Sequence, residues 1–173
     1  TVPHDHPAYA GPIGIVGSTS ANALGAEADV IVAIGTRLMD FTTGSWTLFN
    51  HEAKFISINA ARWDATKHRA LAVVGDAKAT VEELADALKG WKVDAAWTKK
   101  AKSLMAEWNT ALDGYQKPTN APVPTYAQVV GVVNAKAAPR DYMITAAGGL
   151  PGETMKNWRC KTTNSYDLEF GFS

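Results

Sequence analysis

Two stretches of the chain carry residue types that bind anions or hold cofactors. The first is GTRLMDFTTGSW, residues 35–46, which follows the apolar run DVIVAIG. Arg37 offers a forked guanidinium, and Thr42 and Thr43 offer hydroxyl groups, a set that suits a phosphate or a carboxylate. The alternative, which the residues alone favour, is a local turn in which Arg37 pairs with Asp40.

The second stretch is AAGGLPGE, residues 146–153, which follows the apolar run MIT. A strand that runs into glycines and then into a helix presents backbone N–H groups to an anion. The pattern is neither a Walker loop nor a complete dinucleotide-binding fingerprint. A strand-to-helix turn that merely requires glycine and proline is therefore the alternative.

The remaining reactive side chains favour structural roles. His4, Asp5 and His6 lie close together without a further cluster of ligands, so a metal site is not predicted there. Cys160 stands between Arg159 and Lys161 with no histidine nearby in sequence, and we predict a structural cysteine. No Ser/His/Asp order or pair of carboxylates indicates a hydrolytic centre.

The elements that position both stretches alternate between strand and helix. Residues 30–35, 54–59 and 71–75 are short apolar runs rich in β-branched residues, as in parallel strands buried on both faces. Residues 18–29 predict a helix capped by Ser18 or Ser20. This alternation predicts an α/β fold, part of a doubly wound parallel sheet in which the three runs pair as neighbours.

A break in the middle of the chain predicts a second α/β unit. Trp97, Trp108, Leu112 and their neighbours recur at helical spacing and predict a packing face. GYQKPTNAPVP, residues 114–124, has the composition of a linker. Beyond it, Thr125 and Gln128 fit a capping box. We therefore expect one domain over 1–113 and the truncated beginning of another over 125–173.

The composition excludes several classes of protein. The chain has 173 residues with 46% hydrophobic and 20% charged, and its 17 basic and 17 acidic side chains cancel. No basic stripe predicts nucleic-acid binding, and no apolar run approaches the ~20 residues of a membrane span. A single cysteine suits a reducing cytoplasm.

Three segments together resemble the thiamine diphosphate-dependent enzymes. They are GPIGIVGSTSANALGAEADVIVAIGTRLMDFTTGSW, FISINAARWDATKHRALAVVGDA and ITAAGGLPGETMKNWR. DFTTGSW and GGLPGE are most similar to the members that hydrolyse a C–C bond of a cyclic 1,2-diketone in myo-inositol catabolism, giving 5-deoxyglucuronate. The resemblance covers the later part of the family's central domain and the opening of its pyrophosphate-binding domain.

The resemblance implies thiamine diphosphate and Mg²⁺ in a complete enzyme that is a homodimer or homotetramer. It places Gly149, Leu150, Pro151, Gly152 and Glu153 next to the cofactor. The family's activating glutamate and its magnesium motif correspond to segments outside this chain, so no catalytic or metal residue is expected here. We therefore expect this chain alone to be inactive and to hold no cofactor tightly.

For the loop after the first strand, the resemblance leaves two roles. In relatives that bind FAD or ADP, the arginine corresponding to Arg37 lies near the nucleotide phosphates. Here Arg37, Asp40, Thr42 and Thr43 form either a vestigial nucleotide site or an interface loop, with the interface favoured. A nonenzymatic ADP- or FAD-binding module and an acetolactate-synthase-like carboligase are the alternative functions.

Overall fold

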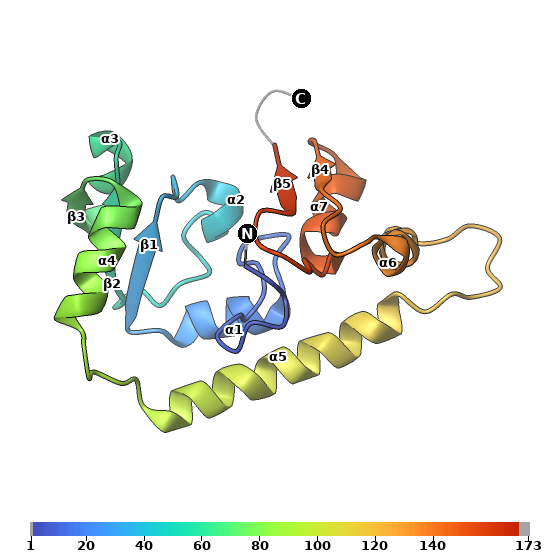
Figure 1. Cartoon of the computed structure of the whole chain (residues 1–173), viewed down its shortest axis with the longest axis horizontal. Coiled ribbons are helices and arrows are strands. Elements are labelled where there is room, and N and C mark those ends of the chain that lie inside the picture. Colours follow the sequence, from blue (N-terminus) through green and yellow to red (C-terminus); the bar gives the residue numbers. More distant parts are fainter. Residues whose placement is uncertain (1, 170–173) are drawn as a thin grey trace.

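A computed structural model describes residues 2–169 (Figure 1). The helices are α1 Thr19–Glu27, α2 Asp40–Thr43, α3 Arg62–Ala65, α4 Ala77–Ala87, α5 Ala95–Tyr115, α6 Tyr126–Lys136 and α7 Gly149–Asn157, with a 3₁₀ turn η1 at Lys67–Arg69. The strands are β1 Val30–Ile34, β2 Lys54–Asn59, β3 Leu71–Val74, β4 Met143–Thr145 and β5 Tyr166–Leu168. The order confirms the predicted alternation of strand and helix.

The first sheet consists of β1, β2 and β3 in that order, and both pairings are parallel. Val30 lies opposite Lys54, and Ile56 lies opposite Leu71. The prediction of three neighbouring parallel strands is therefore confirmed. The strand order follows the chain in one direction, which is consistent with part of a doubly wound parallel sheet.

The predicted burial of this sheet on both faces is wrong for the described residues. In the central strand β2, Ile58 is 1% exposed. In β1, by contrast, Val30, Val32 and Ile34 are 48%, 42% and 46% exposed. Likewise Ile144, at the centre of β4, is 74% exposed. The apolar runs correctly predict strands, but burial depends on elements packed over them, and residues 2–169 do not cover these side chains.

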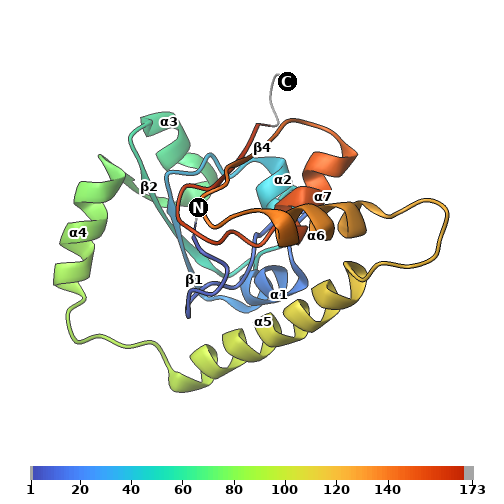
Figure 2. The same ribbon diagram turned by 45° about the vertical axis from the view of Figure 1, so that its right-hand side comes forward.

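Helices α1 and α5 pack against each other along the lower side of the molecule in Figure 1. Ser18 caps the start of helix α1, and its hydroxyl accepts the N–H of Ala21 at 3.2 Å, as the capping prediction required. Helix α5 lies along α1 (Figures 1 and 2) and buries Trp108 and Leu112, which confirms its predicted packing face. An ion pair between α1 and α5 joins Glu27 to Lys100.

The segment after α5 has its own small core. The predicted capping box is present, because Thr125 and Gln128 each accept the other's backbone N–H. Val130 of α6 packs with Trp158 and Cys160, and β4 pairs with β5 in parallel. A loop over residues 116–124 separates α5 from α6, close to the predicted linker.

Several contacts join this segment to the first part of the chain. The N–H of His4 donates to the carbonyl of Cys160 at 2.9 Å. Near the end of α5, Asp113 accepts a hydrogen bond of 2.6 Å from Arg159. The amide of Gln116 donates to the carbonyl of Asn157 at 2.7 Å. His4 and the end of α5 therefore both contact residues at or just after the end of α7.

Candidate functional site

The loop after β1 leaves the strand through unusual backbone angles. Gly35 has φ 63° and its N–H donates to the carbonyl of Ile58 at 2.9 Å, so the turn starts while still attached to β2. Leu38 has φ 48° and is buried, and its N–H donates to the hydroxyl of Thr36 at 3.3 Å. A left-handed leucine is unfavourable, and its burial in the protein holds it there.

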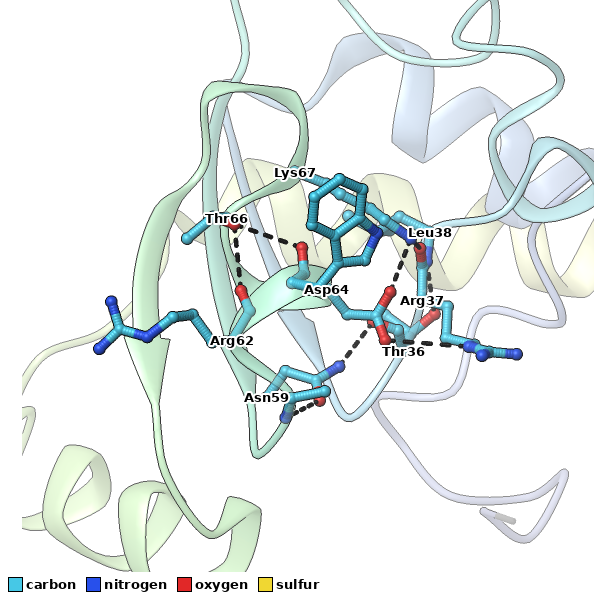
Figure 3. Close-up of polar contacts among 10 residues, drawn as sticks. Thr36, Arg37, Leu38, Asn59, Arg62, Asp64, Thr66 and Lys67 are labelled. Carbon is cyan, nitrogen blue, oxygen red and sulfur yellow. Dashed lines mark hydrogen bonds and ion pairs between the residues drawn. The ribbon is translucent and has the colours of Figure 1, made fainter.

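Asn59, the last residue of β2, fixes this loop to the neighbouring strand (Figure 3). Its side chain is 9% exposed. The amide nitrogen donates to the carbonyl of Thr36 at 3.0 Å, and the amide oxygen accepts the N–H of Ala61 at 2.9 Å. One side chain therefore joins the turns that follow β1 and β2.

Arg37 faces Asp64 and not Asp40, which corrects the predicted ion pair. The Nε atom of Arg37 lies 3.8 Å from Asp64 Oδ2, and Lys67 Nζ lies 2.6 Å from Asp64 Oδ1 (Figure 3). Asp40 is the first residue of α2, whereas Asp64 lies in α3, shortly after β2. Parallel pairing of β1 and β2 brings Arg37 and Asp64 to the same end of the sheet.

The contact leaves most of Arg37 accessible. Its side chain is 72% exposed while that of Asp64 is 13% exposed, so the carboxylate is held mainly by Lys67. A surface ion pair of such length contributes ~1 kcal/mol or less. Arg37 thus remains a cation facing solvent at the carboxyl end of β1.

The two threonines of the loop differ in what they can offer a ligand. Thr43 is fully buried, and its hydroxyl donates to the carbonyl of Met39 at 3.2 Å and accepts the N–H of Trp46 at 3.3 Å. It is therefore a structural residue. Thr42 is partly exposed, and its N–H donates to the carbonyl of Met39 at 2.9 Å. Of the predicted set, Arg37 and Asp40 are the exposed members.

The two aromatic residues of the loop, Phe41 and Trp46, differ in how they pack. Trp46 packs edge-on against Phe55, with ring centroids 5.3 Å apart, and stacks on His68 at 3.5 Å. Phe49 completes this aromatic cluster of Trp46, Phe49, Phe55 and His68, its ring lying 5.2 Å from that of Phe55. Phe41, by contrast, is 51% exposed. Trp46 therefore anchors the loop to the first sheet.

The second candidate stretch forms the turn into α7. Gly148, the N-cap, has φ 134° and ψ −179°, a conformation reserved for glycine. Pro151 has no N–H, and the N–H of Gly152 donates to the carbonyl of Gly148 at 3.1 Å. The backbone donors at this helix end are therefore the N–H groups of Gly149 and Leu150, and no side chain caps them.

The last two predicted residues of this turn are engaged inside the protein. Gly152 is buried, and a methyl group placed there would lie 3.5 Å from Val16. The carboxylate of Glu153 lies 2.8 Å from Lys156 Nζ and accepts the amide of Asn157 at 3.2 Å. Glu153 thus has partners within α7, whereas no side chain caps the first N–H groups of the helix.

Glu153 lines a cleft of about 570 Å³ that lies between the ends of four helices. Thr19 of α1, Tyr115 of α5 and Tyr126 of α6 provide its other walls. Tyr126 also supports the turn, because a methyl group on Gly149 would lie 3.4 Å from its ring. The cleft and the helix end therefore share Tyr126 as a boundary.

Other candidates have limited chemical capacity. Among residues 2–169, no group of three or more His, Cys, Asp or Glu side chains is arranged to hold a metal ion. Cys160 is 7% exposed, and burial raises the pKa of its thiol, as expected of a structural cysteine.

None of the helices that the described residues form is both long and apolar enough to cross a membrane.

Comparison with known proteins identifies the enzyme family to which the chain belongs. Residues 1–84 match the family described as "Thiamine pyrophosphate enzyme, central domain". These residues include the three parallel strands and the loop of Arg37. The chain belongs to the thiamine diphosphate-dependent enzymes.

The individual relatives indicate which members of this enzyme family the chain is similar to. The chain is similar to 3D-(3,5/4)-trihydroxycyclohexane-1,2-dione hydrolase of Listeria innocua, with 35% identity over 94% of this chain and 29% of the relative. The proteins of the same name from Geobacillus thermodenitrificans and Listeria monocytogenes are 31% and 34% identical over 100% of the chain. The chain spans about 30% of the length of these curated relatives.

Proposed function

We propose that this chain is part of a thiamine diphosphate-dependent hydrolase that cleaves the C–C bond of a cyclic 1,2-diketone, trihydroxycyclohexanedione, with water. The observation that carries the proposal is similarity along the whole chain, at 31–35% identity, to proteins named for hydrolysis of that substrate. 5-Deoxyglucuronate is the product we propose. The sheet with Arg37 and the turn into α7 both lie inside the matched region.

Within such an enzyme, residues 1–113 would form the later part of the central domain and residues 125–173 the opening of the pyrophosphate-binding domain. Residues 114–124 would join them. The separate parallel sheets and the loop between α5 and α6 support this division. The contacts of Asp113 and Gln116 with the chain around α7 support a fixed junction.

The turn into α7 fits one end of the cofactor. When bound, thiamine diphosphate supplies the carbanion that attacks a ketone carbonyl. The N–H groups of Gly149 and Leu150 would donate to its diphosphate, and the glycines at 148 and 149 allow close approach. Pro151, Gly152 and Glu153 would support this turn from behind. Glu153 already has Lys156 and Asn157 as partners.

Further requirements of this chemistry would come from elsewhere in the protein. We propose that Mg²⁺ and the activating glutamate are supplied by segments outside this chain, in a homodimer or homotetramer. A cytoplasmic location is proposed because Cys160 is a free thiol.

The test uses the complete protein with Mg²⁺, thiamine diphosphate and the cyclic dione. We expect formation of 5-deoxyglucuronate, and no acetolactate when pyruvate replaces the dione. Acetolactate without dione cleavage would replace the hydrolase with the carboligase. In a parallel arm, the 173-residue chain alone should give no product. Turnover by that chain would show that its residues suffice for catalysis and would overturn the proposed division.

A further inference from the structure

A pocket of about 560 Å³ lies at the amino ends of the strands, at the opposite end of the first sheet from Arg37. Val30, Lys54 and Leu71, each the first residue of its strand, line it. Arg37, by contrast, follows the carboxyl end of β1. The pocket therefore shares Trp46, the last residue of the 35–46 stretch, with the candidate loop, while neither Arg37 nor any residue of the turn into α7 lines it.

One wall of this amino-end pocket is the aromatic cluster. Trp46, Phe49, Phe55 and His68 all line the pocket. The rings of Trp46 and Phe49 lie 6.0 Å apart, and the imidazole of His68 lies against the indole with an interplanar angle of 35°. Partial burial and the nearby Lys67 cation lower the pKa of His68, while Asp40 opposes them. Flat apolar surfaces of this kind bind the face of a ring.

The charges around the pocket have one sign. Lys54 and Arg69 line it, and no aspartate or glutamate of the described chain does. Neither of these two side chains forms an ion pair with a carboxylate of residues 2–169. Two unpaired cations beside an apolar wall favour a ligand that carries negative charge.

The backbone holds these groups in place at a cost. Trp46, His68 and Arg69 have φ of 68°, 58° and 59°, all in the left-handed region. Such angles are unfavourable for residues with a β-carbon, and they accumulate where the surrounding structure fixes a binding surface. Here they come from the loop after β1 and from the 3₁₀ turn η1, and the rings of Trp46 and His68 are in contact.

We propose that the amino-end pocket binds a small anion that carries a flat apolar ring, with the ring on the aromatic cluster and the anionic group between Lys54 and Arg69. The site is independent of the proposed hydrolase function. It differs from a nucleotide site at the carboxyl ends of the strands, because Arg37 takes no part in it.

Phenyl phosphate is the probe, because it combines a ring with an anion. Isothermal titration of the purified protein should show saturable binding of phenyl phosphate that exceeds that of inorganic phosphate, which lacks the ring, and of phenol, which lacks the charge. The double variant Lys54→Ala/Arg69→Ala should bind at least ~10-fold more weakly, since both charged donors are lost. Lys54→Arg keeps the charge and should retain most of the affinity.

Arg37→Ala is the matched control, since it removes an exposed arginine from the opposite end of the sheet. Its affinity for phenyl phosphate should equal that of the unchanged protein. Lys54 and Arg69 are exposed, so their variants should stay folded, as circular dichroism would verify. Three results would overturn the proposal: no saturable binding, equal binding of phenyl phosphate and inorganic phosphate, or equal affinity in the double variant.

Discussion

Replacing Asn59 with alanine tests whether a single buried amide holds together the loops that end β1 and β2. The substitution removes the bond of 3.0 Å to the Thr36 carbonyl and the bond of 2.9 Å to the Ala61 N–H. Each such bond contributes ~0.5–1.5 kcal/mol. Thr36 and Ala61 are partly or fully exposed and regain water, so no further desolvation cost is added. We expect Asn59→Ala to lower the free energy of unfolding by about 1–3 kcal/mol.

Asn50 offers a matched control. Its side-chain oxygen accepts the N–H of Glu52, two residues ahead, as that of Asn59 accepts the N–H of Ala61. Asn50→Ala removes only this local bond at an exposed position, and we expect a loss below ~1 kcal/mol. Urea denaturation followed by tryptophan fluorescence measures both variants. Equal losses would refute the reasoning, because the bond between strands would then contribute nothing.

Further predictions concern backbone, thiol, pH and ligand. Gly148→Ala should destabilise the protein by about 1–3 kcal/mol, because Gly148 has a φ of 134°. Gly114→Ala should be neutral or stabilising, because Gly114 lies inside α5 and nothing is close to the added methyl group. Thermal denaturation measures both variants. Cys160 should react with iodoacetamide only on unfolding, and rapid reaction of the native protein would contradict its burial. Burial raises the pKa of Tyr9 from 10.0 to about 12, so the unfolded state loses this proton first and stability should fall as pH rises from 10 to 12; an equal fall in Tyr9→Phe would exclude this cause. Calorimetry should show no micromolar binding of ADP or FAD to the complete protein, and such binding, if lost in Arg37→Ala, would restore the nucleotide site.

Local patterns in the sequence were sufficient to predict the elements. The cap at Ser18, the capping box of Thr125 and Gln128, and the strand around Ile58 depend on neighbouring residues, and all are present. Contacts between distant residues were not predictable in this way. Asp64 was missed as the partner of Arg37 because only the parallel pairing of β1 and β2 brings them together.

The sequence predicted neither which side chains are buried nor the amino-end pocket. Val32 belongs to an apolar run, yet its exposure depends on what packs over the sheet. The contact of Trp46 with His68 requires left-handed angles at both residues, and nothing in their types indicates such angles. The sequence offered only a histidine shortly before a strand and a tryptophan two residues after a glycine as signals.

Helix α5 fixes how the part of the chain after it is rotated relative to the part before it. Its 21 residues span ~30 Å, with the contact to Glu27 near one end and that to Arg159 near the other. Deleting one residue between them would rotate the far end by ~100° and turn Asp113 away from Arg159. The alignment with the Listeria monocytogenes relative extends over 198 positions, more than the 173 of the chain, so that relative carries extra residues. Such length differences can be absorbed by the loop at 116–124 but not by the helix before it.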